Sequence, residues 1–376
     1  MTVLPIDVFQ QELPAMKALL AELVQIESPT TDKAAVDRLG ARLMAEVQAL
    51  GGQVEVYPQA EAGDHFAARW GDGAGGILLL CHFDTVYPLG TLAHMPFVEA
   101  DGKWRGPGTM DMKGGIVTLL TALRLLREHG QWPARPVTAL FTSDEETGSR
   151  TSRPVIEDLA RDAGLVLVLE PAFAPGKLKT ARKGVGGMTL QAGGVAAHAG
   201  ADHKSGRNAI EALAHAVIAA QALTDYTRGT TVNVGMISGG TRTNVVPDEA
   251  LARLDFRVND PAEVQRLERW AADLQPAVAG TTIRAAVELN RPPMPRDAIM
   301  AATVEKAGAI AAQLGLTLSE SSSGGGSDAN FVSPLGVPVL DGLGPAGSNA
   351  HSSNEFADAA SFAVQSALLA ALIANW

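Results

Sequence analysis

Cysteine, aromatic residues and net positive charge are all scarce in this chain of 376 residues. Its one cysteine, Cys81, excludes an internal disulfide and a metal cluster held by several thiolates. Lys and Arg number 30 against 41 Asp and Glu, and the resulting formal net charge of -11 argues against a general binder of nucleic acid or of anionic membranes. Aromatic residues make up 5% of the chain, so we expect a mostly aliphatic core.

Long hydrophobic runs are also missing. The longest candidates, residues 77–81 and 367–374, are far shorter than the roughly 18 apolar residues of a membrane span. Residues 1–7 (MTVLPID) lack a basic segment followed by an apolar one, so we expect no signal peptide and a cytoplasmic protein. With 46% hydrophobic and 19% charged residues, the chain is expected to fold around one large core or two smaller ones.

Buried strands alternate with helices in the first part of the chain. Continuous apolar runs predict strands covered on both faces over residues 77–81, 137–142 and 165–169. Amphipathic stretches predict helices over residues 9–26, from an N-cap at Asp32 to about residue 50, over 116–129 and over 156–162. Apolar strands that alternate with helices favour parallel pairing in an α/β sheet.

The pattern changes near residue 179. The later strands alternate apolar and polar residues (185–192, 231–236 and 252–258), with helices expected over 208–223 and 261–274. Half-polar strands with helices on one side indicate an α+β layer. The α/β pattern resumes near residue 290, with a helix over 297–314 and a strand over 337–340. We therefore predict an α/β domain made of residues 1–178 and 290–376, into which an α+β domain of residues 179–289 is inserted.

Histidine or carboxylate residues follow three of the predicted buried strands. The first strand leads into His82 and Asp84, the second into Glu145 and Glu146, and the third into Glu170. Ligands bind outside the carboxyl ends of the strands in open parallel sheets. One polar residue at such a place is typical of a solvated loop, but three converging strand ends indicate a functional site.

Two glycine-rich loops add further candidates. Residues 106–115 (GPGTMDMKGG) lead into a helix with one acid, Asp111, at their centre, and residues 344–353 (GPAGSNAHSS) present His351 after a strand. Each has an ordinary alternative. Asp111 suits the cap of a helix N-terminus, and His351 taken alone suits a structural histidine.

Together these segments supply two imidazoles and at least four carboxylates. Such ligands, without thiolate, suit zinc, manganese or cobalt. The acids exceed what one structural metal needs and suit two ions about 3.5–4 Å apart that share a bridging carboxylate. Glu145 and Glu146 are adjacent, so one can coordinate a metal while the other acts as a base. Asp84 follows His82 by two residues on an extended chain and is therefore placed to accept the second N–H of that imidazole.

Four motifs occur in the order found in the dizinc exopeptidase/aminoacylase family, which this sequence resembles: residues 82–86 (HFDTV), 106–115, 143–148 (SDEETG) and 197–200 (AHAG). That family includes glutamate carboxypeptidase, acetylornithine deacetylase and succinyl-diaminopimelate desuccinylase. The resemblance covers nearly the whole chain. It implies a three-layer α/β catalytic domain with a mostly parallel sheet and an inserted α+β lid that dimerises.

The resemblance implies two Zn2+ ions per chain, with Co2+ or Mn2+ as substitutes. Asp111 would bridge the two ions. His82 and Glu170 would complete one metal site, and Glu146 and His351 would complete the other.

The resemblance also implies roles for residues that do not bind metal. Glu145 would be the general base, and Asp84 would orient His82. In a homodimer formed through the lid, His198 would reach the partner's active site and stabilise the oxyanion. Asn244, within residues 239–247 (GGTRTNVVP), resembles the family's lid asparagine near that site.

The nearest branch of the family resembles glutamate carboxypeptidase and suggests substrate-binding residues. Arg257 and Arg291 occupy positions that handle a terminal carboxylate in that branch, and Lys177 matches a residue that contacts an acidic side chain. The glycine loop around Gly326 would let backbone approach the bound carboxylate. Arg257 has the alternative of a solvated charge on an alternating strand, and Arg182 is interpreted as a surface charge.

We therefore expect a two-zinc hydrolase that cleaves an amide next to a free carboxylate in a short peptide or acyl-amino acid, without nucleic-acid or membrane partners. Glu145 would take a proton from water and pass it to the leaving amine, while His198 and a metal would hold the oxyanion. An N-acyl-amino-acid deacylase would use the same site. A non-catalytic binding protein should have lost the base or a ligand, and a dinuclear phosphoesterase would not explain the lid histidine.

Overall fold

The computed structural model describes residues 3–376, which divide into two compact units. Of these residues, unit 1 comprises residues 3–181, Arg296–Ser322 and Ser327–Trp376, and unit 2 comprises Arg182–Pro295 and Ser323–Gly326. The division falls a few residues after the predicted boundaries at 178/179 and 289/290. Residues 1–2, the start of the segment examined for a signal peptide, lie outside the described residues.

Unit 1 is built on an eight-stranded sheet. In spatial order its strands are β1 (Gln53–Tyr57), β2 (His65–Trp70), β6 (Val137–Thr142), β3 (Gly76–His82), β7 (Ala163–Val168), β17 (Val339–Asp341), β9 (Lys177–Arg182) and β16 (Ser319–Ser323). The four central strands β6, β3, β7 and β17 are parallel. Antiparallel pairs join β1 to β2, β2 to β6 and β9 to β17. The predicted parallel pairing of the apolar strands is confirmed.

Both faces of this sheet are covered. Along β3, Ile77, Leu79 and Cys81 belong to the main hydrophobic core, while Leu78 and Leu80 are buried without belonging to it. Because successive side chains of a strand point to opposite faces, the two sets lie in different layers. Helix α4 packs on β3, while helices α5 and α9 pack against β7 and β17. This three-layer packing explains why the central strands are continuous apolar runs.

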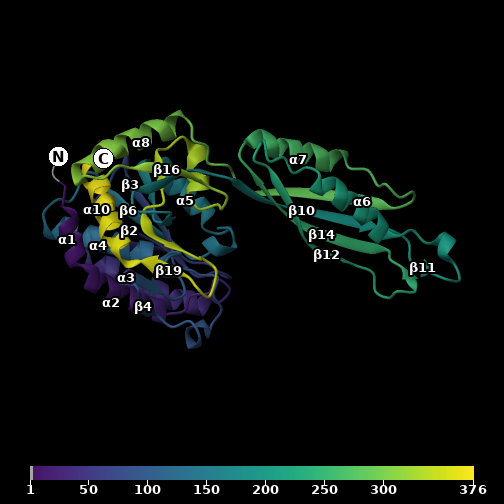
Figure 1. Ribbon diagram of the computed structural model, residues 1–376, viewed down its shortest axis with the longest axis horizontal. Coiled ribbons are helices and arrows are strands. Elements are labelled where there is room, and N and C mark those ends of the chain that lie inside the picture. Colours follow the sequence, from purple (N-terminus) through teal and green to yellow (C-terminus); the bar gives the residue numbers. More distant parts are fainter. Residues whose placement is uncertain (1–2) are drawn as a thin grey trace. The chain divides into compact units, whose positions relative to one another are not determined.

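The helices of unit 1 are α1 (Ile6–Gln11), α2 (Leu13–Gln25), α3 (Lys33–Ala49), α4 (Lys113–Glu128), α5 (Arg153–Arg161), α8 (Ala298–Ala311), α9 (Ala329–Val332) and α10 (Ala359–Asn375). The first and last of them, α1 and α10, pack against each other (Figure 1). Asp32 caps α3 as predicted, since its Oδ1 accepts from Ala35 N at 2.9 Å. Among residues 3–376, no helix combines the length and apolar character that a membrane crossing needs.

The prediction of one helix over residues 9–26 is wrong. The chain forms α1 and α2, which are separated at Glu12, and Pro14 occupies the first turn of α2. A proline lacks the N–H that would continue a preceding helix but is tolerated in a first turn. The break therefore falls where Pro14 requires a new helix start.

A small five-stranded sheet in unit 1 joins two of the site loops. Its order is β4 (Val98–Ala100), β5 (Lys103–Arg105), β19 (Phe356–Asp358), β18 (Gly344–Ser348) and β8 (Pro171–Ala172). β18 pairs in parallel with β8, which begins directly after Glu170. β18 and β19 pair antiparallel, so residues 349–355 form the loop between them. The loop that carries His351 is thereby tied to the strand that follows Glu170.

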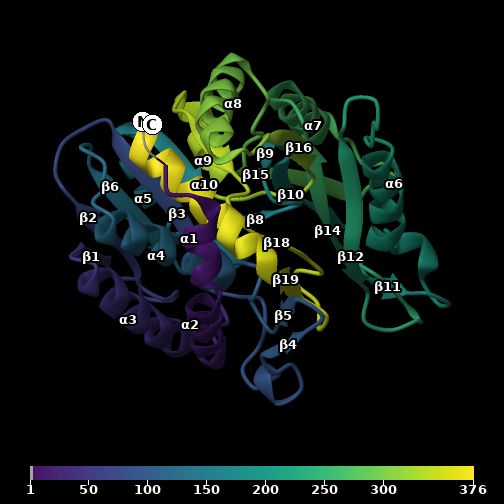
Figure 2. The ribbon, with the colours of Figure 1, turned by 60° about the vertical axis from the view of Figure 1, so that its left-hand side comes forward.

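Unit 2 is an α+β layer. Its four-stranded antiparallel sheet has the order β12 (Thr231–Gly239), β14 (Glu249–Val258), β10 (Gly184–Gly193) and β15 (Thr282–Arg291). Helices α6 (Ala209–Gln221) and α7 (Pro261–Asp273) pack on this sheet, and Figure 2 shows α6 lying along β12 and β14. A two-stranded ladder, β11 (Ala197–His198) with β13 (Val245–Val246), completes unit 2. The predicted fold class, an α/β domain with an inserted α+β domain, is confirmed.

Helix α4 lies unusually close to the end of β7 because of a glycine. A Cβ added at Gly115 would lie 2.1 Å from the carbonyl oxygen of Leu169, and no real Cβ approaches an oxygen so closely. Leu169 precedes Glu170, and α4 follows the loop that carries Asp111. The glycine therefore lets two loops of the candidate site approach each other.

We predict opposite effects for two helical glycine-to-alanine changes. Gly115→Ala should lower the free energy of unfolding by about 2 kcal/mol or more, because the added methyl overpacks the α4–β7 contact. Gly308→Ala in α8 is the matched control, since nothing lies within 4 Å of the added Cβ there. It should stabilise by about 0.5–1 kcal/mol through helix propensity. Urea unfolding measures both, and equal shifts would contradict the close approach at Gly115.

Candidate metal centre and active site

Three parallel strands end at one edge of the eight-stranded sheet and bring candidate ligands there. β3 ends in His82, a turn containing Glu145 and Glu146 follows β6, and Glu170 comes two residues after β7. β3 pairs in parallel with both β6 and β7, so the three carboxyl ends meet at the same edge. The parallel arrangement explains how residues far apart in sequence reach one place.

His82 is 2% exposed and lies among three carboxylates. Its Nε2 is 3.2 Å from Asp111 Oδ1 and 3.6 Å from Glu170 Oε1. Its Nδ1 is 3.1 Å from the backbone oxygen of Asp84 and 3.3 Å from Asp84 Oδ1. One ring nitrogen thus faces the site and the other is held by Asp84, which is the arrangement typical of a histidine that binds metal.

The loop before α4 places Asp111 between two imidazoles. Gly108 in this loop has φ +72°, and a Cβ there would lie 2.9 Å from Thr85 Cγ2, so only glycine fits without strain. The N-cap of α4 is Met112 and makes no side-chain capping bond, so the alternative of Asp111 as a helix cap is not supported. Instead Asp111 Oδ1 faces His82, and its Oδ2 lies 3.3 Å from His351 Nε2.

His351 lies in the loop between β18 and β19. Its φ of +62° and that of Asn349, +64°, fall in the left-handed region that non-glycine residues seldom adopt. Ser352 braces the turn, because its N–H and hydroxyl donate to Asn349 O at 3.2 and 2.9 Å. The His351 side chain is 52% exposed, and its Nε2 lies 3.1 Å from Glu146 Oε2. Backbone strain of this kind persists where the surrounding structure fixes a side chain for function.

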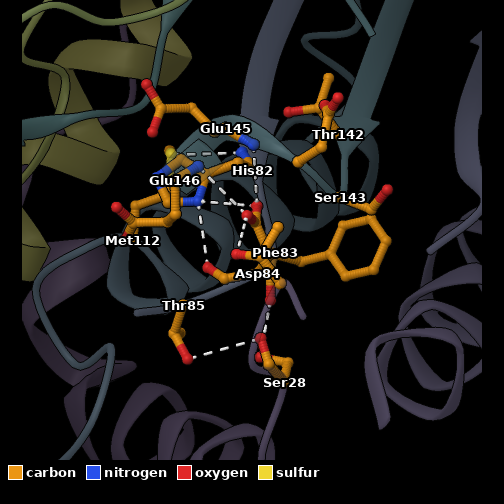
Figure 3. Close-up of polar contacts among 12 residues, drawn as sticks. Ser28, His82, Phe83, Asp84, Thr85, Met112, Thr142, Ser143, Glu145 and Glu146 are labelled. Carbon is orange, nitrogen blue, oxygen red and sulfur yellow. Dashed lines mark hydrogen bonds and ion pairs between the residues drawn. The ribbon is translucent and has the colours of Figure 1, made fainter. Parts of the chain in front are cut away.

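The buried carboxylate of Asp84 holds the turn that carries the two adjacent acids (Figure 3). Its Oδ1 accepts from Glu145 N at 3.3 Å, and its Oδ2 accepts from Glu146 N at 3.2 Å. The Thr30 hydroxyl donates to the same Oδ2 at 2.6 Å. Asp84 therefore contacts His82 on one side and the backbone of Glu145 and Glu146 on the other.

A buried histidine braces the other end of that turn. His65 Nδ1 accepts from Ser143 N at 3.2 Å, and its Nε2 lies 2.9 Å from Thr151 Oγ1. Thr151 in turn donates from its N–H and hydroxyl to Asp144 Oδ2 at 2.7 and 2.8 Å. Burial lowers the pKa of His65, which favours the neutral ring that these bonds require.

The clustered carboxylates and imidazoles of the site shift each other's pKa values. Hydrogen bonds with Asp111 and Glu146 raise the pKa of His351 to about 11. Burial opposes the charge of His82, but its bonds to Asp111 and Asp84 outweigh burial and raise its pKa. Burial likewise opposes ionisation of Asp111, yet the two imidazoles keep the pKa of that carboxyl well below its usual range. Burial raises the pKa of Glu146.

These residues fit a divalent metal. One atom each from His82, Asp111 and Glu146 lies within 4.8 Å of the others, and all are nitrogen or carboxylate oxygen donors that zinc accepts. Glu146 Oε1 is buried and has no hydrogen-bond partner among residues 3–376. A buried, unpaired carboxylate oxygen is costly and is explained when a cation supplies its partner.

The lid candidates His198 and Asn244 belong to unit 2 and lie close together. β11 pairs with β13 so that His198 faces Val245, and Asn244 O accepts from Ala199 N at 2.9 Å. One nitrogen of the His198 ring has a structural role within its own turn. His198 Nδ1 accepts from the backbone N–H groups of Gly200 and Ala201 at 3.1 and 3.0 Å.

The substrate-binding candidates have different surroundings. In unit 2, Arg257 forms a two-bond pair with Asp255 at 2.9 and 3.0 Å. Arg291 lies beside the glycine loop, where a Cβ at Gly326 would lie 2.6 Å from Arg291 Cδ. Lys177 is half-buried at the start of β9 in unit 1.

Arg182, expected at the surface, is 4% exposed, so that expectation is wrong. The Arg182 side chain is buried because its Nη1 donates to the carbonyl oxygens of Gly325 and Gly326, at 3.1 Å each.

Comparison with known proteins places this site in a family. Residues 78–375 match peptidase family M20/M25/M40. The chain is 33% identical over 350 residues to carboxypeptidase G2 from Pseudomonas sp. (strain RS-16), covering 91% of this chain and 84% of that protein. It is 30% identical over 386 residues to succinyl-diaminopimelate desuccinylase from Rhodospirillum centenum, covering 96% of each.

A solved structure is similar along its whole length. Aminopeptidase PepT from Bacillus cereus shares 26% identity with a TM-score of 0.75, covering 96% of this chain and 98% of that one. The resemblance noted in the sequence is therefore confirmed. The chain belongs to peptidase family M20/M25/M40 and is a metallopeptidase or amidohydrolase.

Proposed function

We propose that this protein is a two-zinc exopeptidase that cleaves an amide next to a free carboxylate, in the manner of a glutamate carboxypeptidase. One observation carries the dinuclear part of the proposal. The two oxygens of Asp111 face two different imidazoles, and each imidazole faces one further carboxylate: Glu170 beside His82, and Glu146 beside His351. Two such pairs around one carboxylate match a bridged pair of ions.

The residues that would hold the metals follow from this arrangement. His82 and Glu170 would bind one Zn2+, Glu146 and His351 the other, and Asp111 would bridge them; Co2+ or Mn2+ would serve as substitutes. The chemistry that bound metal supplies here is Lewis-acid polarisation of the scissile carbonyl and activation of water at neutral pH. Asp84 would keep His82 oriented through its Nδ1.

Glu145 is the proposed general base. Its backbone N–H, like that of Glu146, is held by Asp84, so one buried group sets the positions of both acids. Glu146 lies against His351 and is the proposed ligand, and the adjacent Glu145 would take a proton from water and pass it to the leaving amine. Adjacent residues thereby divide the roles of ligand and base.

The substrate's free carboxylate is the proposed partner of Arg291 and of the backbone at Gly326. A Cβ at Gly326 would lie 2.6 Å from Arg291 Cδ, so the missing side chain makes room for Arg291 beside the loop. A guanidinium can bind a carboxylate through two parallel hydrogen bonds. Arg257, Asn244 and Lys177 are proposed as further substrate contacts. The similarity to carboxypeptidase G2 supports recognition of a carboxylate on the leaving side of the amide.

An N-acyl-amino-acid deacylase is the second candidate. The similarity to succinyl-diaminopimelate desuccinylase favours it, since such an enzyme removes an acyl group with the same machinery. A non-catalytic binding protein is disfavoured because Glu145 and all five proposed ligands are present, and a dinuclear phosphoesterase is disfavoured because it would not explain His198. The cytoplasmic location remains a proposal, supported by the single cysteine.

We propose a homodimer formed through unit 2. β12 is an edge strand of the unit 2 sheet, and it exposes Met236 and Ile237, which are 66% and 61% exposed. An open edge with apolar side chains favours pairing with a second chain. His198 would serve the partner's active site, because a neutral ring whose Nδ1 accepts two N–H groups carries its proton on Nε2 and can donate it to an oxyanion.

A substrate panel tests the proposed specificity. We expect turnover of N-acyl-glutamates and of dipeptides with a C-terminal glutamate, at a kcat/KM at least about 10-fold above that of neutral N-acetyl amino acids. Purified enzyme is assayed by release of free amine. A preference for acyl groups regardless of the amino acid would favour the deacylase, and hydrolysis of phosphate esters alone would contradict both.

Metal analysis tests the proposed centre. We expect two zinc ions per chain, loss of activity with a chelator, and recovery with zinc or cobalt. Glu145→Gln should keep the metal and lose nearly all turnover, because an amide cannot take a proton from water. Glu146→Gln is the matched variant and should lose metal, because it removes an anionic ligand. Equal metal content in the two variants, or full activity with one ion per chain, would contradict the assignment.

Subunit complementation tests the shared site. His198→Ala and Glu145→Gln chains, each inactive alone, should regain activity when mixed under conditions that allow subunit exchange. One site of each heterodimer then receives an intact Glu145 from one chain and an intact His198 from the other. Exchange is confirmed separately with differently tagged chains. Absence of recovery despite exchange would show that His198 does not act across the dimer.

A further inference from the structure

Glu355 is a fully buried carboxylate that the proposed mechanism does not use. It lies in the same β18–β19 loop as His351. Its Oε1 accepts from the backbone N–H groups of Met110 and Asp111 at 2.8 and 3.1 Å. Its Oε2 accepts from Gly108 N at 3.3 Å and from the Tyr87 hydroxyl at 2.5 Å.

These four donors decide what Glu355 can do. An ionised carboxylate offers about four lone-pair positions on two oxygens, and here each oxygen receives two donors. No acceptor site is left over for coordination. Glu355 therefore does not suit a sixth metal ligand, although it contacts the backbone of the central one.

The contacts join three separate segments around the proposed metals. Tyr87 follows the His82–Asp84 segment, and its hydroxyl oxygen also lies 2.9 Å from Ser352 O. Met110 and Asp111 belong to the loop that supplies the bridging carboxylate. Glu355 itself is four residues from His351. One side chain thus fixes the loops that carry three of the five proposed ligands relative to each other.

Stability alone would not favour a carboxylate at this place. Moving an anion from water into a buried position costs several kcal/mol, and well-packed apolar side chains of similar volume often stabilise as well or better. The four donors are three backbone N–H groups and one hydroxyl, none of which carries a full positive charge. What a carboxylate provides here, and an apolar side chain cannot, is the orientation of the N–H groups beside Asp111.

We propose that Glu355 is a positioning residue of the metal centre, which holds the Asp111 loop in the geometry needed to bind metal. This inference rests on the proposed metal site. Glu355 would hold Asp111 through the backbone N–H groups of Met110 and Asp111. It would also hold the His82 segment through Tyr87 and the His351 segment through the loop that it shares with His351. Groups that orient metal ligands without touching the metal typically change metal affinity 10- to 100-fold when they are removed.

Zinc binding by Glu355→Gln tests the proposal. Metal-free protein is titrated with zinc chloride by calorimetry, and the melting temperature is measured with and without zinc. A glutamine keeps one oxygen for the N–H groups but turns an NH2 donor toward Gly108 N and the Tyr87 hydroxyl. We expect zinc affinity to fall at least about 10-fold while the chain stays folded, with a smaller zinc-induced rise in melting temperature.

A matched control separates positioning from stability. Glu263 in unit 2 is also buried and accepts from the Thr230 hydroxyl at 2.7 Å and from Arg266 Nη2 at 2.7 Å. Glu263→Gln should lower the melting temperature and leave zinc affinity unchanged. If Glu263→Gln weakened zinc binding as much as Glu355→Gln, general destabilisation would explain both effects and the proposal would be overturned.

The remaining outcomes are also decisive. Wild-type zinc affinity in folded Glu355→Gln would overturn the role of Glu355 and leave the proposed metal site intact. Absence of zinc binding by the wild-type chain would instead overturn the metal site and this inference with it. If Glu355→Gln does not fold, Tyr87→Phe decides, because it removes one donor from the same carboxylate. A fall in its zinc affinity supports the proposal, and an unchanged affinity contradicts it.

Discussion

The buried carboxylate of Asp84 is the constraint on which the site geometry depends. An anion removed from water is costly unless its oxygens are well satisfied. Here the Thr30 hydroxyl, two backbone N–H groups and the His82 ring surround it. Those N–H groups belong to Glu145 and Glu146, the two adjacent acids after β6. The hydrogen bonds that satisfy the buried charge of Asp84 therefore also fix the proposed base and a proposed ligand relative to His82 of β3. In such a network, a shift of one member leaves a buried hydrogen-bonding group of another member without its partner.

The central architecture was predictable because its signals are local. An apolar run buried on both faces, followed at once by histidine or acid, points to the carboxyl end of a parallel strand. β3, β6 and β7 follow this rule. Several strands were missed, among them β2 (HFAARW) and β15 (TIRAAVELNR) of the two larger sheets. β2 runs antiparallel beside β6 and contains no continuous run of aliphatic side chains. β15 alternates, but its apolar side is only half-buried at the edge of the unit 2 sheet.

Within the candidate site, the proposed ligands could be named from the sequence, whereas the residues that support them could not. Thr30 contacts a carboxylate 54 residues away, and Glu355 contacts a backbone N–H 245 residues away. His65 joins Ser143 and Thr151 across 78 and 86 residues. A threonine, a glutamate and a histidine in such positions have no distinguishing neighbours in sequence, because their partners are brought to them by the fold. Arg182 was misjudged for the same reason, since its carbonyl partners belong to a distant glycine loop.

The interrupted connectivity of unit 1 has a consequence for the order in which the chain matures. β17, a strand between β7 and β9 in the sheet, and the loop with His351 and Glu355 belong to the last segment, Ser327–Trp376. During synthesis the chain emerges from its N-terminus, so the segments through β9 and the whole of unit 2 are made before β17 can enter the sheet. Long-range contacts of this kind form late and slowly. The candidate metal centre is therefore complete only after this segment has been made, and a ribosome-bound chain that has folded its earlier segments still lacks one of the two imidazoles that face Asp111.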